Sequence, residues 1–132
     1  MNEADLIYHL SETINRSWAL IQWWASISFG LLLVAHFASD RLNRYLLIFL
    51  SALYLGFSIL MMAVLQKNVG VTNAVYVDLA KLAESSEAIT ATGRFWLENR
   101  GISFQILLPI TLLGTFIGVW GYLIYCYRKQ SQ

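Results

Sequence analysis

Charged side chains are scarce in this chain. They make up 13% of its 132 residues, against about 25% in an ordinary soluble domain. Hydrophobic residues make up 58%. A soluble domain of this size has too much surface for its volume to bury so many apolar side chains. The chain has room for one domain, and its composition predicts that this domain lies in a lipid bilayer.

The chain also lacks a second cysteine, an excess of basic residues and a basic N-terminal segment. The one cysteine, Cys126, has no partner for an internal disulfide. A net charge of +1 with both signs mixed argues against a nucleic-acid partner. The first ten residues contain Glu3 and Asp5 but no Lys or Arg, unlike a cleavable signal peptide. We therefore expect the first hydrophobic segment to stay as an anchor.

The sequence contains no HExxH, CxxC, Walker loop or nucleophile elbow. Its long apolar runs hold no carboxylate or lysine, which proton-coupled pumps and small cation exporters generally need. We therefore expect no enzyme, no cofactor and no metal site.

Three charge-free runs give the organisation: 17–39, 45–66 and 101–127. Each has at least the roughly 20 residues that a helix needs to cross about 30 Å of hydrocarbon. Strands are excluded because lone strands leave backbone groups unpaired in lipid, and three cannot close a barrel. The sequence predicts an all-α integral membrane protein with three transmembrane helices. The link 40–44 is so short that the first two must be antiparallel neighbours.

The segment 67–100, which we expect to lie outside the membrane, separates the second and third runs. Its start, 68–73, has the composition of a turn followed by a helix cap. An amphipathic helix near 73–91 should follow, with Gly93 as its stop. Its stripe recurs at spacings of four and three: Val75, Leu79, Leu82, Ser86 and Ile89.

The N-terminal tail, 1–16, repeats this pattern more weakly with Leu6, Leu10 and Ile14. Two spans separate this tail from the segment 67–100, so both must lie on one side of the membrane. We expect them to pack on each other, or to lie on the lipid surface, as a small cap.

Basic residues indicate the orientation. The link 40–44 and the C-terminal tail 128–132 pack Arg41, Arg44, Arg128 and Lys129 into very short segments. The positive-inside rule then places these segments in the cytoplasm, with the N-terminus outside, in a plasma or bacterial inner membrane.

Aromatic rings gather near the ends of the runs, which favours anchoring in the headgroup zone. A quinone or lipid site is the alternative. The residues concerned are Trp18, Trp23, Trp24, Trp96, Trp120, Tyr122, Tyr125 and Tyr127.

Each run carries two small residues four positions apart. The pairs are Ser26 with Gly30, Ala52 with Gly56, and Gly114 with Gly118, the last extended by Gly121. Such pairs let helix backbones approach closely, which in lipid replaces the missing hydrophobic drive. We expect them to pack helices within the chain, with a partner or a second copy as the alternative.

Three further residues are weaker candidates. His36, one helical turn before Asp40, should hydrogen-bond there or reach water, with proton or cofactor handling as the alternative. Pro109 lacks an N–H, which frees the carbonyl of Gln105 and favours a bend, or alternatively a gating hinge.

The function that fits best is a non-enzymatic accessory, assembly or regulatory subunit of a membrane complex. Its partners would be lipids and other membrane subunits or further copies of itself. The alternative is a homo-oligomeric pore, because three spans and an outside N-terminus resemble the general plan of phage holins, without any shared motif. A small transporter or redox subunit comes third.

Overall fold

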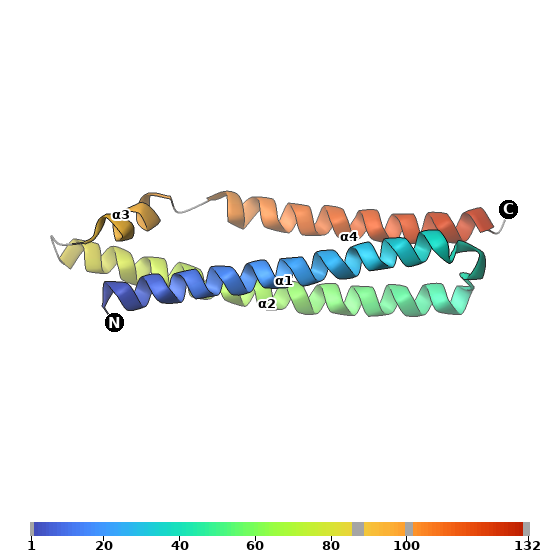
Figure 1. Cartoon of the computed structure of the whole chain (residues 1–132), viewed down its shortest axis with the longest axis horizontal. Coiled ribbons are helices and arrows are strands. Elements are labelled where there is room, and N and C mark those ends of the chain that lie inside the picture. Colours follow the sequence, from blue (N-terminus) through green and yellow to red (C-terminus); the bar gives the residue numbers. More distant parts are fainter. Residues whose placement is uncertain (1, 86–88, 100–101, 131–132) are drawn as a thin grey trace.

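The computed structural model describes residues 2–85, 89–99 and 102–130, and these residues form helices joined by short links. In order, they are α1 (Glu3–Phe37), the 3-10 turn η1 (Ser39–Arg41), α2 (Arg44–Ser85), α3 (Ala91–Glu98) and α4 (Ile102–Gln130). Figure 1 shows a rod in which α1 and α2 run antiparallel along most of the length, with α2 extending beyond the start of α1. The short α3 and the long α4 follow one another along one side of this pair, and the two termini lie at opposite ends.

Local signals fix the ends of the two longest helices. Asn2 and Asp5 form a capping box at the start of α1, in which each side chain bonds the other residue's backbone N–H. After η1, the side chain of Asn43 accepts a hydrogen bond from the Leu46 N–H at 2.8 Å and caps α2. Only η1, one residue before it and two residues after it separate α1 from α2, and the two helices pack on each other. The expected antiparallel hairpin is confirmed.

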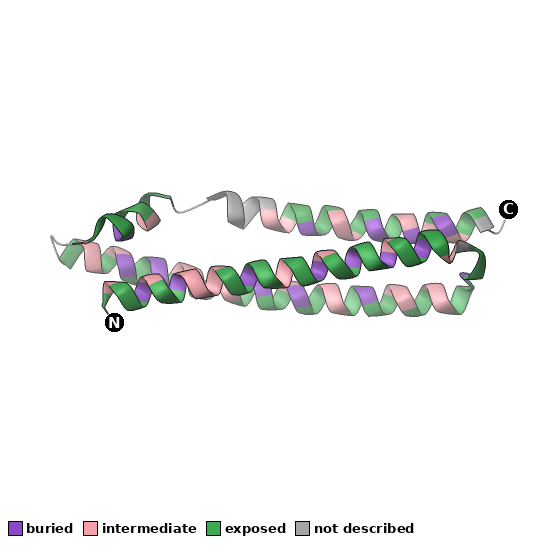
Figure 2. Cartoon of the chain, viewed as in Figure 1, coloured by how far each residue is buried: buried purple, intermediate pink, exposed green. Residues whose placement is uncertain are grey.

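The main core lies where α1, α2 and α4 run together. Its buried side chains recur at spacings of three, four and seven, so each helix contributes one narrow stripe (Figure 2). The helix α1 packs on both others, whereas α2 and α4 meet each other much less. The buried members are Trp24, Leu31, Ala35, Leu42, Tyr54, Met61, Leu65, Leu112, Val119, Leu123 and Cys126.

A second core holds together the end that carries the N-terminus. Leu6 and Leu10 of α1 pack against Val75, Tyr76 and Leu79 of α2. Five half-buried apolar residues complete the cluster: Ile14, Leu82, Ile89, Trp96 and Leu97. We call this end, made of 3–16, 68–85 and α3, the headpiece. The expected packing of the N-terminal tail on the segment between the second and third runs is confirmed.

The turn expected at 68–73 is wrong, because α2 continues through it without interruption. Gly70 keeps a negative φ, and the Asn68 side chain donates a hydrogen bond to the Ser17 hydroxyl of α1 at 3.2 Å. Contacts with α1 before and after this stretch outweigh its weak helix propensity. With 42 residues rising about 1.5 Å each, α2 is about 63 Å long, roughly twice the hydrocarbon thickness.

Other helix boundaries also differ from those expected. The N-terminal tail is not separate from the first run, because α1 is one helix from Glu3 to Phe37. Of the expected stripe, Ser86 lies outside the described residues, and Ile89 lies beyond the end of α2 at Ser85 but packs in the second core. Gly93 does not stop a helix but lies in the first turn of α3, where its N–H bonds the Thr90 side chain.

Three helices are long and apolar enough to cross a membrane: α1, α2 and the part of α4 from Leu108 to Lys129. In their most apolar stretches only 22%, 11% and 17% of the residues are buried inside the protein. Figure 2 shows the exposed surface around the narrow buried stripes. Contiguous exposed apolar area on this scale is rare in soluble monomers and suggests a location in a membrane.

Candidate functional site

Hydrogen bonds between side chains join α1 to α2 along their interface. The hydroxyls of Ser28 and Tyr54 lie 2.8 Å apart, and Trp24 Nε1 donates to Ser58 Oγ at 3.3 Å. Nearer the headpiece, Asn68 donates to Ser17. No buried side-chain nitrogen or oxygen among the described residues lacks a partner. We call these bonds between α1 and α2 the ladder. The ladder sets the register of the two helices, and its polar atoms bond each other within the bundle.

Stacked aromatic rings continue from this ladder across the bundle. Trp24 stacks on Tyr54, Tyr54 on Phe116 with centroids 5.4 Å apart, and Phe116 on Trp120. Trp24 is only 5% exposed, so the expectation that it anchors in the headgroup zone is wrong. Trp18 and Trp23, which are exposed, remain candidates for that role. The ladder and the stacked rings join α1, α2 and α4 into one unit.

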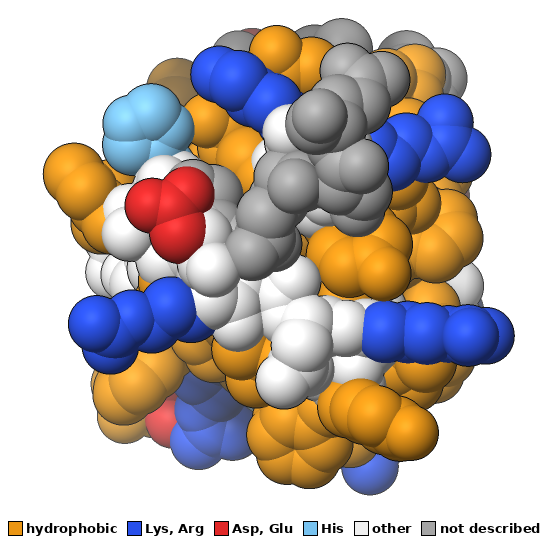
Figure 3. Space-filling model, turned by 90° about the vertical axis from the view of Figure 1, so that its right-hand side faces the viewer, with side chains coloured by type: hydrophobic (Ala, Val, Ile, Leu, Met, Phe, Trp, Pro, Cys, Tyr) orange, Lys and Arg blue, Asp and Glu red, His pale blue; other side chains and the backbone are white. Residues whose placement is uncertain are grey.

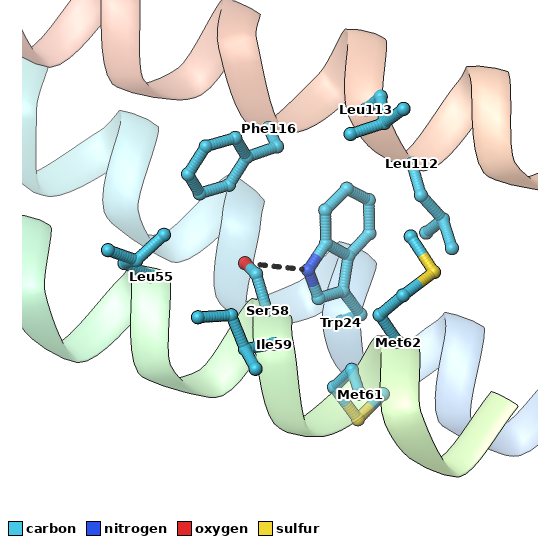
Figure 4. Close-up of a pocket in the computed structure, with 9 residues that line it drawn as sticks. All are labelled: Trp24, Leu55, Ser58, Ile59, Met61, Met62, Leu112, Leu113 and Phe116. Carbon is cyan, nitrogen blue, oxygen red and sulfur yellow. Dashed lines mark hydrogen bonds between the residues drawn. The ribbon is translucent and has the colours of Figure 1, made fainter. Parts of the chain in front are cut away.

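Beside this column, a hollow of about 200 Å³ opens between α2 and α4. Figure 4 shows Trp24 of α1 as its floor, with Leu55 and Ile59 on the α2 side and Leu113 and Phe116 on the α4 side. The remaining lining is Ser58, Met61, Met62 and Leu112. The hollow is therefore apolar, and its hydroxyl, that of Ser58, already accepts a bond from Trp24.

A second hollow of about 240 Å³ continues the first toward the headpiece. The two share Met62 and Leu112. This second hollow is also lined by Leu65, Gln66, Val69, Asn73, Leu108 and Pro109. We call the pair the α2–α4 groove, which is apolar along most of its length and carries amides at its headpiece end.

The small-residue pairs do not pack helices within the chain, so this expectation is wrong. A Cβ built on Gly30, Gly56, Gly114, Gly118 or Gly121 would meet no neighbouring atom within 4 Å in the described part of the chain. Ser26 and Ala52, their partners, are exposed too. The reason is register: no member of a pair belongs to the buried stripe of its own helix, and each lies one or two residues, about 100–200°, from a buried residue of that stripe. All seven residues therefore face outward.

His36 is exposed, as expected of a side chain that reaches water, and it also bonds a partner that the sequence did not indicate. Its Nδ1 lies 2.9 Å from the Tyr122 hydroxyl, which joins the end of α1 to α4. Asp40 lies in η1. Figure 3 shows this end of the rod, where basic side chains surround the edge. The sequence places Arg41, Arg44, Arg128 and Lys129 at this end.

Pro109 lies inside α4 without ending the helix, and it is half-buried in the wall of the α2–α4 groove. The side chain of Gln105, its expected neighbour, lies outside the described residues. Cys126 is buried in the main core, against other side chains of the bundle.

Sequence reasoning missed Tyr54 and Asn68 as α2 members of the ladder. The signal was present: they fall on the same spacing of three and four as the buried Met61 and Leu65. Within the described residues, no three His, Cys, Asp or Glu side chains lie close enough to hold a metal ion. No family model matches this chain, and no curated protein or solved structure matches it.

Proposed function

We propose that this chain is an integral membrane protein that serves as a non-enzymatic accessory, assembly or regulatory subunit of a membrane complex. Its three long helices would cross the bilayer, and their outer faces would contact other membrane subunits or further copies of the chain. The cytoplasmic end would be the one with Arg41, Arg44, Arg128 and Lys129, which leaves the headpiece outside.

The observation that carries this proposal is the outward position of every small-residue pair. On α4 the exposed stripe combines two glycines four apart with bulky neighbours: Ile110, Gly114, Ile117, Gly118 and Gly121. A glycine groove between branched side chains lets a second helix approach closely in lipid, where packing drives association. Since the chain does not use these grooves itself, a partner helix is the natural occupant.

A holin-like pore has less support. A water-filled path between copies would need polar groups turned outward and free to meet water. The exposed hydroxyls of two residues bond their own helices instead: Ser26 to the Gln22 carbonyl at 2.9 Å, and Thr115 to the Thr111 carbonyl at 2.8 Å. The ladder hydroxyls bond inside the bundle.

The test replaces Gly118 with leucine and, as a matched control, with alanine. Both variants should keep the monomer folded, because space is open above Gly118. We expect Gly118→Leu to lose association with copurifying subunits or labelled copies in mild detergent and in vesicles. Gly118→Ala should retain most of it. If Gly118→Leu associates as the unchanged chain does, the proposed role of this face is wrong.

A further inference from the structure

The α2–α4 groove combines an apolar trough with a polar end. We propose that it binds one acyl chain of a membrane phospholipid, with the ester and phosphate groups at Gln66 and the chain end against Trp24. This inference rests on the proposed placement of the protein in a bilayer, but not on any protein partner.

The groove exists because α1 holds α2 and α4 apart. Trp24 of α1 fills the space behind them and closes the trough as a floor (Figure 4). Met62 and Leu112 join the two hollows into one path. Met61 and Met62 give part of this wall flexible thioether side chains, which adapt readily to a chain of irregular shape.

Water is a poor occupant of such a trough. A cavity lined by Leu, Ile and Phe stays dry even at about 150 Å³. A partner helix is a poor occupant too, because a helix with its side chains is about 10–12 Å wide. Hollows of about 200 and 240 Å³ are too small for it. A single hydrocarbon chain is apolar, as the lining requires, and thin enough for hollows of this volume.

The part of the trough from Leu55 to Gln66 matches one leaflet, and Val69 and Asn73 line its continuation beyond Gln66 toward the headpiece. Gln66 is the last residue of the charge-free run on α2, and Lys67 follows it, so this level would lie at the headgroup boundary. Leu55, at the far end of the trough, lies eleven positions earlier, which is about 16 Å along the helix. Half of a hydrocarbon core about 30 Å thick is about 15 Å.

The polar end suits the head of such a lipid. Gln66 is exposed, and its amide has no hydrogen bond to the described residues. An amide N–H can donate to the ester or phosphate oxygens that lie at this depth. The neighbouring Lys67 is exposed and forms no ion pair within the described part of the chain, so its charge favours a phosphate nearby.

Brominated phospholipids test the chain end of this site, because bromine on an acyl chain quenches tryptophan at contact. The variant keeps Trp24 and replaces Trp18, Trp23, Trp96 and Trp120 with Phe. Reconstituted in vesicles of brominated phosphatidylglycerol, it should lose most of its Trp24 emission, although Trp24 is buried within the protein. Adding Leu113→Phe, which narrows the trough, should restore the emission. Leu33→Phe, an equal change on the exposed surface of α1, should not.

A second variant keeps only Trp23, which is 68% exposed outside the groove. Its quenching by the same vesicles reports that the helices lie in lipid. Strong quenching of Trp23 with none of Trp24 would overturn the groove proposal and leave the proposed function standing. That outcome would mean that protein, such as a second copy, closes the groove. Absence of both signals would overturn both proposals.

The unmodified chain gives an independent measurement. Native mass spectrometry from mild detergent should show one retained phospholipid. Gln66→Leu should lose this lipid, whereas Gln22→Leu, the same change on an exposed position of α1, should keep it. A wild-type chain that carries no lipid, or Gln66→Leu and Gln22→Leu variants that retain it equally, would contradict the proposal.

Discussion

The carboxylate of Glu3 accepts hydrogen bonds from both the backbone N–H and the side-chain hydroxyl of Thr90, 87 residues away. Thr90 also caps α3, since its hydroxyl accepts a bond from the Gly93 N–H at 3.3 Å. One acidic residue in the first turn of α1 therefore fixes where α3 begins. This contact adds polar bonds to the apolar packing of Ile89, Trp96 and Leu97 that holds α3 on the second core.

Glu3→Ala should loosen α3 while leaving the main core intact. The lost bonds involve a charged acceptor but lie partly in solvent, so the expected cost is about 1 kcal/mol. Hydrogen exchange in the segment 91–98 should become faster, with no change in 108–129. Glu12→Ala is the matched control, because Glu12 pairs within α1 with Arg16. Equal exchange of α3 in both variants would show that the Glu3–Thr90 contact contributes nothing.

Two glycine-to-alanine changes should act in opposite directions. At Gly70, in the continuous part of α2, a Cβ meets no atom within 4 Å among the described residues, so alanine should add up to about 1 kcal/mol of helix stability. Thermal unfolding in detergent checks the sign. A lower stability for Gly70→Ala would indicate the turn that the sequence suggested at 68–73.

At Gly93 a Cβ would overlap the Glu3 carboxylate and approach Cγ1 of Ile89 to 2.8 Å. Crowding of this kind costs about 1–3 kcal/mol, which outweighs the gain in helix propensity of under about 1 kcal/mol. Gly93→Ala should therefore speed hydrogen exchange in α3, as Glu3→Ala does. Combined with Glu3→Ala it should cost less than the two changes added, since both break one contact. If the stability losses of the two single variants added up fully in the double variant, the loss in Gly93→Ala would not come from its contact with Glu3.

Removing the hydroxyl of Tyr54 should lower the free energy of unfolding a little, and removing its whole ring should lower it much more. Tyr54→Phe removes the bond to Ser28 and should cost about 0.6 kcal/mol, the average for such bonds in membrane proteins. Tyr54→Ala also removes the ring stacked on Trp24 and Phe116, and should cost about 2 kcal/mol or more through the cavity it leaves. Tyr45→Ala, at an exposed ring, should change the unfolding temperature little. A Tyr54→Phe variant as unstable as Tyr54→Ala would contradict this division.

Much of the helical architecture could be predicted from the sequence, because the length of a charge-free run and the length of a link each constrain the local structure directly. Runs without charge predict helices long enough to span hydrocarbon, and the link 40–44 is too short for anything but an antiparallel hairpin. The apolar stripes of the tail and of α2 likewise predicted that Leu6 and Leu10 pack near Val75 and Leu79.

The outward small-residue pairs and the groove could not be predicted from composition. In a helix that is apolar all round, hydrophobicity does not say which face is inside. Gly118 and Trp24 are both suited to either face, and their positions depend on the three-way packing of α1, α2 and α4. Likewise, 68–73 has turn-like residues, but contacts with α1, such as Asn68 to Ser17, hold it helical.

Extraction of membranes with alkaline carbonate tests the central claim most directly, because it removes proteins held only at the surface and leaves those that span the bilayer. If the exposed apolar faces of α1, α2 and α4 lie in lipid, the full chain should remain with the membrane pellet and should need detergent to become monodisperse. Release into the carbonate supernatant, as a chain that stays monodisperse in plain buffer, would contradict the account.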